Sequence, residues 1–95
     1  MADIKESEKV IERRLCKGVK DKGGLALKFP ATQFAGIPDR ICLLPGARID
    51  WVELKSTGVK PTKLQLIVHG RLKALGFTVL ILDSTAGVDK YLASV

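Results

Sequence analysis

The residues with the clearest chemical potential in this sequence are two carboxylates and a lysine, Asp39, Glu53 and Lys55. Asp39 stands at the start of one apolar run, directly after a proline, and Glu53 and Lys55 lie two positions apart on the next run. Because alternate residues of a strand share a face, Glu53 and Lys55 project to one side, while Val52 and Leu54 point to the other. The spacing therefore predicts a charged pair with apolar packing beneath it, close to a second carboxylate.

Two carboxylates brought together with a backbone carbonyl, such as that of Leu54, suit a hard divalent cation, Mg²⁺ or Mn²⁺. A protonated lysine cannot ligate metal, so Lys55 is expected to orient or activate an attacking water, or to neutralise charge that grows on a phosphate. A second interpretation stays open. Glu53 and Lys55 would then form a solvated ion pair on a hairpin, and Asp39 would be a turn former.

A first helix is predicted over residues 3–22, and two glycines end it. Asp3 followed by Glu6 indicates a capping arrangement at its start. Apolar residues recur at helical spacing along this stretch, namely Ile4, Ile11, Leu15 and Val19.

Glu8 falls in the middle of that apolar stripe when the helix is projected at ~100° per residue. Burying an ionised carboxylate without a partner costs several kcal/mol, so Glu8 should meet a metal, a cation or water in a cleft. Glu12 follows one turn later and is the second choice for a third acidic ligand. For both residues the alternative is a helix edge from which the side chain reaches solvent.

The remaining pattern predicts one domain, residues 1–95, of α/β (α+β) class. Residues 25–29 form a strand, and residues 40–44 and 49–55 pair as an antiparallel hairpin through a Pro-Gly-Ala-Arg turn. A second helix over residues 62–76 and a buried strand over 77–82 follow, with a short helix after residue 84. Helix, three strands, helix and strand in this order imply a sandwich with a mixed central sheet flanked by helices.

Gln65 lies at the start of the second helix and has two possible roles. It could reach toward Lys55 or a bound phosphate, or it could complete a capping box with Thr62; the two roles do not exclude each other. His69, the one histidine, has no neighbour at metal-ligand spacing, so a surface or packing role is expected.

The formal net charge of +6 favours a polyanionic partner, DNA above all, because basic residues set against phosphates release counterions. The plausible phosphate contacts are Lys28, Arg40, Lys60 and Lys63. No apolar run approaches the ~18 residues that span a bilayer, and the two cysteines form no CxxC pair, so a cytoplasmic setting without membrane contact is expected. Two alternatives to an enzyme stay open. The protein could be a non-catalytic nucleic-acid-binding module, or it could be a subunit that recruits a nuclease.

Several short segments of the sequence form a specific combination, namely EKVIE (8–12), GGLALK (23–28), GIPDR (36–40), WVELKS (51–56), Gln65 and LKALGF (72–77). Together they resemble the VRR-NUC family of nucleases, within the PD-(D/E)xK superfamily, and specifically its small stand-alone phage and bacterial members. The resemblance implies a restriction-endonuclease-like sandwich in which Asp39 and Glu53, with Glu8 or Glu12, hold divalent metal.

The same resemblance implies that Lys55 serves catalysis, that Gln65 supports the site, and that the chain is an Mg²⁺- or Mn²⁺-dependent endonuclease hydrolysing DNA phosphodiesters. Stand-alone members look like Holliday junction resolvases, whereas larger relatives cut flaps. A chain this small has little surface with which to grip branched DNA, so a homodimer is expected. The turn after residue 44 departs from the pattern, because a second glycine would be expected where Ala47 stands.

Overall fold

A four-stranded mixed sheet forms the centre of the protein in the computed structural model, which describes residues 4–30 and 34–95. The strands lie in the order β1-β2-β3-β4; β1–β2 and β2–β3 are antiparallel, and β3–β4 is parallel. This confirms the predicted fold class and the predicted order of elements. None of the helices in the described ranges is long and apolar enough to cross a membrane. The elements are α1 (Glu8–Asp21), β1 (Leu25–Lys28), β2 (Arg40–Leu44), β3 (Arg48–Leu54), α2 (Lys63–Ala74), β4 (Thr78–Leu82) and α3 (Thr85–Ala93).

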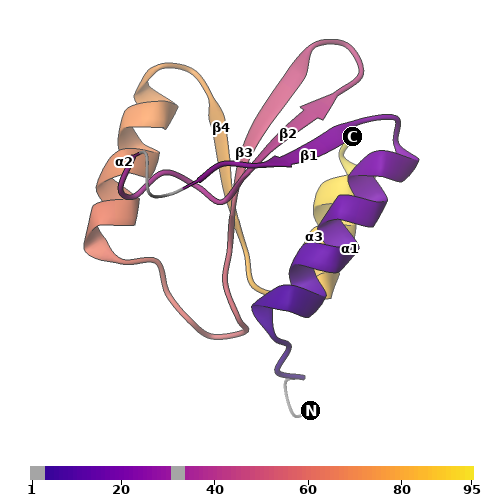
Figure 1. Cartoon of the computed structure of the whole chain (residues 1–95), viewed down its shortest axis with the longest axis horizontal. Helices are drawn as coiled ribbons and strands as arrows, with labels where there is room; N and C mark the ends of the chain where they lie inside the picture. The colour runs from indigo at the N-terminus through magenta and orange to yellow at the C-terminus, as the bar shows by residue number, and fades with distance from the viewer. Residues whose placement is uncertain (1–3, 31–33) are drawn as a thin grey trace.

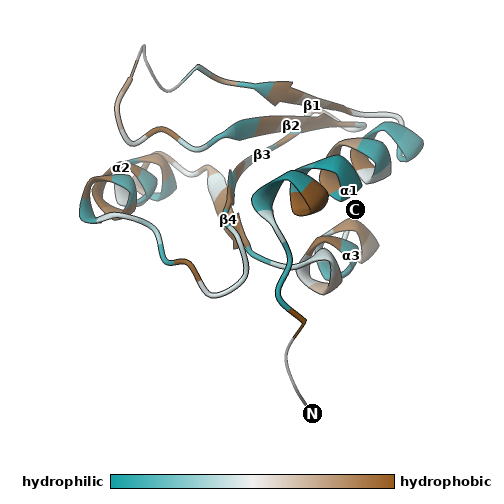
Figure 2. Cartoon of the chain, turned by 60° about the horizontal axis from the view of Figure 1, so that its bottom comes forward, coloured by the Kyte–Doolittle hydropathy of each residue, from teal (hydrophilic) through white to brown (hydrophobic). Residues whose placement is uncertain are grey.

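The sheet separates two helical layers (Figure 1), with α1 and α3 together on one side and α2 on the other, where it packs along β4. In the second view the apolar side of α1 turns toward the sheet (Figure 2). The main core lies between the sheet and the α1–α3 layer, and both Val52 and Leu54 belong to it. Glu53 points the opposite way, toward α2, as the two-residue period predicted. The other fully buried members of this core include Ile11, Leu15, Val19, Cys42 and Val88.

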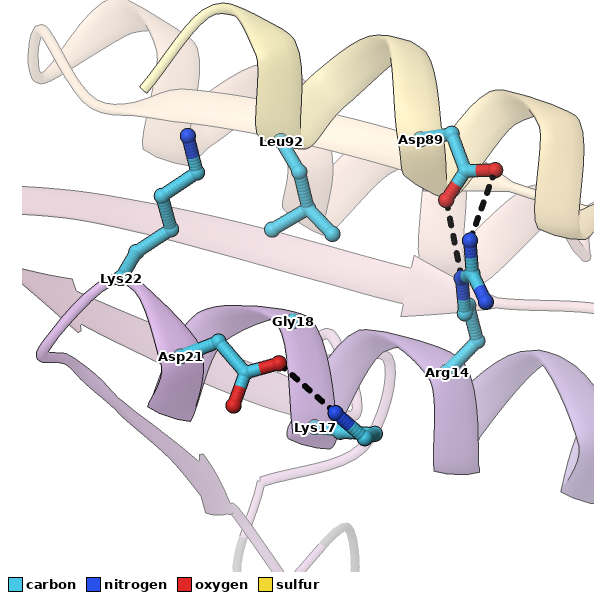
Figure 3. A pocket seen from close by; sticks show the side chains of 7 residues that line it. All are labelled: Arg14, Lys17, Gly18, Asp21, Lys22, Asp89 and Leu92. Carbon is cyan, nitrogen blue, oxygen red and sulfur yellow. Dashed lines mark hydrogen bonds and ion pairs between the residues drawn. The ribbon is translucent and has the colours of Figure 1, made fainter.

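The C-terminal half of α1 packs closely on α3 (Figure 3), because Gly18 has no side chain to hold Leu92 away. Arg14 donates two hydrogen bonds to Asp89 across the same contact, with a shortest distance of 2.9 Å. Both partners are exposed, so solvent screening keeps the contribution of this pair to stability small. The groove here is lined by both basic and acidic side chains, and none of the predicted catalytic residues lies in it.

The first helix begins later than predicted. Ser7 is the N-cap and its hydroxyl accepts from the Val10 amide at 3.3 Å, while Ile4 lies before the helix and is 81% exposed. Glu6 caps a different helix, because its carboxylate accepts from the amide and hydroxyl of Thr85, the first residue of α3, at 2.8 and 2.7 Å. The predicted cap at Asp3 lies outside the described residues.

In the β2–β3 turn, an alanine adopts the backbone conformation that a second glycine was expected to supply. Gly46 has φ 81°, and Ala47 has φ 61° and is the one non-glycine residue with positive φ in the described parts of the chain. The turn therefore keeps the backbone form for which a second glycine was expected, and the alanine adopts it at a steric cost of roughly 1–2 kcal/mol.

Exchanging the residue types of this turn should change stability in opposite directions. Ala47→Gly is expected to raise the free energy of unfolding by up to about 1 kcal/mol, because glycine adopts positive φ without steric penalty. Gly46→Ala adds one methyl group with free space around it, so its backbone conformation alone should lower stability by about 1 kcal/mol. Urea denaturation of the two variants measures both values, and a lower midpoint for Ala47→Gly would contradict the assignment.

Candidate active site

Asp39 is held beside β3 by the backbone of its neighbours. It immediately precedes β2, and its Oδ2 accepts from the Leu54 amide at 2.9 Å, while its carbonyl accepts from the Phe29 amide at 3.0 Å. Since β2 and β3 pair in register through Arg40 and Val52, Asp39 lies opposite Glu53. Strand pairing thus brings together the two carboxylates that are 14 positions apart in the sequence.

The loop before Asp39 needs a glycine. Gly36 has φ +87°, and a Cβ there would lie 2.8 Å from a methyl carbon of Val68 and 3.1 Å from the Leu64 carbonyl oxygen of α2. Positive φ and this close approach both exclude a larger residue. Gly36 therefore lets the loop rest on α2 and deliver Asp39 to the end of β2.

Glu53 is the centre of the cluster and is only 1% exposed. The Nζ of Lys55 lies 3.8 Å from its Oε2, and the Nε2 of Gln65 donates to the same oxygen at 3.4 Å. The other oxygen, Oε1, is buried without a hydrogen-bond partner in the described part of the chain. Glu53 and Lys55 thus meet on one side of β3, and Asp39 joins them.

The electrostatics of the cluster show a shortage of positive charge. Burial, the adjacent Asp39 and the charge of Glu8 together raise the pKa of Glu53 to about 8, against the opposing effect of Lys55. At Glu53, the positive charge of Lys55 therefore opposes the negative charges of both Asp39 and Glu8.

Glu8 reaches this cluster from the first turn of α1. Its amide donates to the Ser56 hydroxyl at 3.3 Å, and Glu6 and Thr57 exchange two hydrogen bonds that tie the same segment to the loop after β3. Partial burial raises the pKa of Glu8, with a further contribution from Asp39 and an opposing one from Lys55. The expected burial of Glu8 in the apolar stripe is wrong, because α1 begins at Glu8 and its first residue extends past the core and is exposed.

Glu12 has a different partner. Its Oε1 lies 3.1 Å from the Nη2 of Arg40, whose Nη1 donates to the Ala26 carbonyl at 3.1 Å. Only 13% of the Arg40 side chain is exposed, and its guanidinium already forms these two contacts within the protein. The geometry favours Glu8 over Glu12 as the third carboxylate of the cluster.

Gln65 forms the predicted capping box, and its side chain also reaches Glu53, whereas Lys55 or a bound phosphate was expected there. Its Oε1 accepts from the Thr62 amide at 2.8 Å, and its own amide donates to the Thr62 hydroxyl at 3.2 Å, which completes the capping box. Because the cap uses the side-chain oxygen, the side-chain nitrogen is the atom that faces Glu53. Helix capping therefore fixes the orientation of the amide in the site.

His69 was missed by the sequence analysis as a site residue. It is 2% exposed, and its Nε2 lies 3.5 Å from Oε1 of Glu53. Burial lowers the pKa of His69, as do the charges of Lys73 and Lys55. The signal that would have indicated it is its spacing from Gln65, since residues four apart share a face of a helix.

The predicted phosphate contacts differ in availability. Lys28 is the last residue of β1; it is exposed, and its positive charge lowers the pKa of Glu8. Lys60 is exposed in the loop before α2, and Lys63 is exposed as the first residue of α2. Arg40 is the exception because of its pairing with Glu12.

The donor set fits a hard divalent cation. Among residues 4–30 and 34–95 no three His, Cys, Asp or Glu side chains are gathered closely enough to hold a metal as they stand, and mutual repulsion is a physical reason for carboxylates to stay apart without a cation. The unpartnered Oε1 of Glu53, next to Asp39 and Glu8, is an oxygen donor that lacks a positive partner. Oxygen donors of this kind are those that Mg²⁺ and Mn²⁺ prefer.

Two of three comparisons with known proteins found similar chains. No family model matches the sequence. A phage protein of the Acyrthosiphon pisum secondary endosymbiont phage 1, "Putative nuclease p44", is 47% identical over 77 residues, which cover 81% of this chain and 83% of that protein. A solved structure described as a VRR_NUC domain superposes with a TM-score of 0.84 at 28% identity, covering 93% of this chain and 97% of that one.

The mixed sheet with its three helices and the similarity to these proteins define a nuclease with a PD-(D/E)xK-like fold. Nucleases of this type are typically metal-dependent. The chain belongs to the VRR-NUC family, as the sequence resemblance indicated, and nucleic acid is its substrate class.

Proposed function

We propose that this protein is an Mg²⁺- or Mn²⁺-dependent DNA endonuclease whose ion is held by Glu8, Asp39 and Glu53. The observation that carries the proposal is the buried Oε1 of Glu53, which accepts no hydrogen bond from the described residues and lies near two further carboxylates. The carbonyl of Leu54 is a further ligand in this proposal, and Glu12 remains the second choice for the helix ligand.

The protein's own groups have distinct roles in hydrolysis. When bound, the divalent ion supplies Lewis-acid polarisation of the phosphate and a water of lowered pKa. Lys55, whose Nζ lies 3.8 Å from Glu53, orients the attacking water or neutralises charge on the phosphate oxygens. Gln65 keeps the Glu53 carboxylate in place, and the exposed Lys28, Lys60 and Lys63 hold neighbouring phosphates.

The proposed substrate is branched DNA, with the four-way Holliday junction as the first choice and a flap as the alternative. The net charge of +6 suits a substrate rich in phosphates. Two copies related by a two-fold axis would present two active sites to two strands of a junction.

An open apolar face of the sheet supports a second copy as the partner. Leu25, Leu27 and Ile49 are 59%, 46% and 41% exposed, and strand register places them on the face away from the core. On this face α2 packs along β4 and leaves β1 open. Two identical faces of this kind can cover each other, which is how a two-fold interface is built.

Cleavage of defined DNA substrates tests the proposal. With Mg²⁺ or Mn²⁺ we expect the four-way junction to be cut in preference to flap, nicked and linear duplexes, and a chelator should abolish all cutting. Sedimentation of the same samples should show a dimer, and Leu27→Glu should shift it to monomer, because a charge cannot be buried unpaired in an apolar interface. Equal cutting of all four substrates would refute the junction preference, and cutting in a chelator would refute the metal requirement.

A further inference from the structure

His69 is a buried polar side chain to which the proposed reaction gives no role. Neither ring nitrogen has a hydrogen-bond partner among the described residues, and Nε2 lies 3.5 Å from Oε1 of Glu53, which also lacks a hydrogen bond there. An unpaired buried polar group costs about 1–3 kcal/mol. A contribution to stability therefore does not explain why the His69 ring and Oε1 of Glu53 are buried facing each other.

The geometry of α2 gives each oxygen of Glu53 its own neighbour. Gln65 and His69 lie four residues apart on one face of the helix; the first donates to Oε2 and the second lies beside Oε1. The 3.5 Å separation slightly exceeds the usual range for a nitrogen–oxygen hydrogen bond. Contacts of this kind are often long in the free enzyme and tighten when the site is assembled.

We propose that His69 is a positioning residue whose Nε2–H fixes the Glu53 carboxylate in the orientation that binds the divalent ion. This inference rests on the proposed metal-dependent function. An imidazole carries a hydrogen on Nε2 in the cation and in one of its neutral tautomers, so the ring can donate in either state. Carboxylates that ligate metals are in turn held by hydrogen bonds from surrounding groups, and loss of such a group typically lowers metal affinity about 10–100-fold.

Titration of the metal-free protein with Mn²⁺, followed by calorimetry, tests the role of His69 without requiring cleavage. His69→Phe keeps a planar ring and removes the donor, so its Kd for Mn²⁺ should rise about 10–100-fold. His69→Gln returns a side-chain N–H and should recover most of the affinity. The stability of metal-free His69→Phe should not fall, because the substitution removes two nitrogens that are buried without partners.

Ile67→Gln is the matched control on the same helix. Ile67 is 55% exposed and lies on the opposite side of α2 from His69, so Mn²⁺ affinity should match that of the wild type. His69→Leu repeats the loss of the donor in a smaller side chain, in case the phenylalanine variant does not fold.

The outcomes separate the two proposals. Wild-type affinity in both the phenylalanine and leucine variants would overturn the role of His69, as would a glutamine variant that is as weak as they are. Absence of Mn²⁺ binding by the wild-type protein would instead overturn the metal-dependent function, before any variant is compared.

Discussion

Replacing Glu53 with glutamine is expected to reduce DNA cleavage by about a thousandfold or more while leaving the protein folded. A catalytic ion contributes several kcal/mol to transition-state stabilisation, and each 1.4 kcal/mol corresponds to about tenfold in rate. The fold should tolerate the change, because burial and the neighbouring Asp39 already disfavour the charged form of this carboxyl. DNA binding should persist, since the exposed lysines are untouched. Single-turnover cleavage and a DNA titration in the absence of metal measure the two effects.

Asp39→Asn should give the same loss, because the amide oxygen can still accept from the Leu54 amide while the second negative charge is removed. Wild-type cutting by either variant would refute the assignment of both carboxylates.

Asp50 provides a matched control on the same strand. It is buried on the core side of β3, where it accepts from the Tyr91 hydroxyl at 2.7 Å and from Arg48 at 2.9 Å. Asp50→Asn weakens hydrogen bonds to a charged group, each of which contributes about 1.5–3 kcal/mol, so it should lower stability and leave cleavage at moderate temperature unchanged. Glu53→Gln and Asp50→Asn are thus expected to separate activity from stability on opposite faces of one strand.

Features of the site that depend on local spacing were predictable from the sequence. The two-residue period of a strand placed Glu53 and Lys55 together and set Val52 and Leu54 in the core. The hairpin, with its strand bounds correct to within one residue, brought Asp39 opposite Glu53. These predictions succeeded because strand geometry and pairing depend on residues close together in the sequence.

Features that depend on distant contacts were not predictable. Glu8 is positioned by the hydrogen bond from its amide to the Ser56 hydroxyl. The segment before α1 is held by two hydrogen bonds between Glu6 and Thr57, which are 51 positions apart. Glu6 itself serves α3, whose first residue is 79 positions away. No periodicity in the sequence encodes such pairings, so the start of α1 was placed too early and the exposure of Glu8 was misjudged.

The capping role of Gln65 gave no indication that the same face of α2 lies against Glu53. Thr62 and Gln65 match a capping box, which accounts for both residues without any reference to the site. The position of β4 beside β3 then turns the same helix face toward Glu53, and His69 follows from that placement. The parallel crossover through α2 thus places one side chain of the same helix beside each oxygen of the Glu53 carboxylate.

Lys55→Met should lower the rate of cleavage at saturating DNA and Mn²⁺ by about 10²–10⁴-fold, the range for loss of a positioned proton-transfer or charge-stabilising group. Methionine keeps much of the length of the stem in this partly buried position and removes only the ammonium group. Mn²⁺ binding should be retained, which distinguishes this variant from Glu53→Gln, because a protonated lysine is not a ligand. Lys55→Arg should recover little activity, since the planar guanidinium is larger and hydrogen-bonds in a different geometry.

Lys60→Met is the control for loss of positive charge alone. Lys60 is exposed in the loop before α2, so its loss should weaken DNA binding and reduce the dependence of affinity on salt, with the rate at saturating DNA unchanged. If Lys55→Met behaved in this second way, with weaker binding and an unaffected maximal rate, Lys55 would be a phosphate contact. The water-orienting role would then have to come from another group near Glu53, and Gln65 and His69 are the described side chains that already contact that carboxylate.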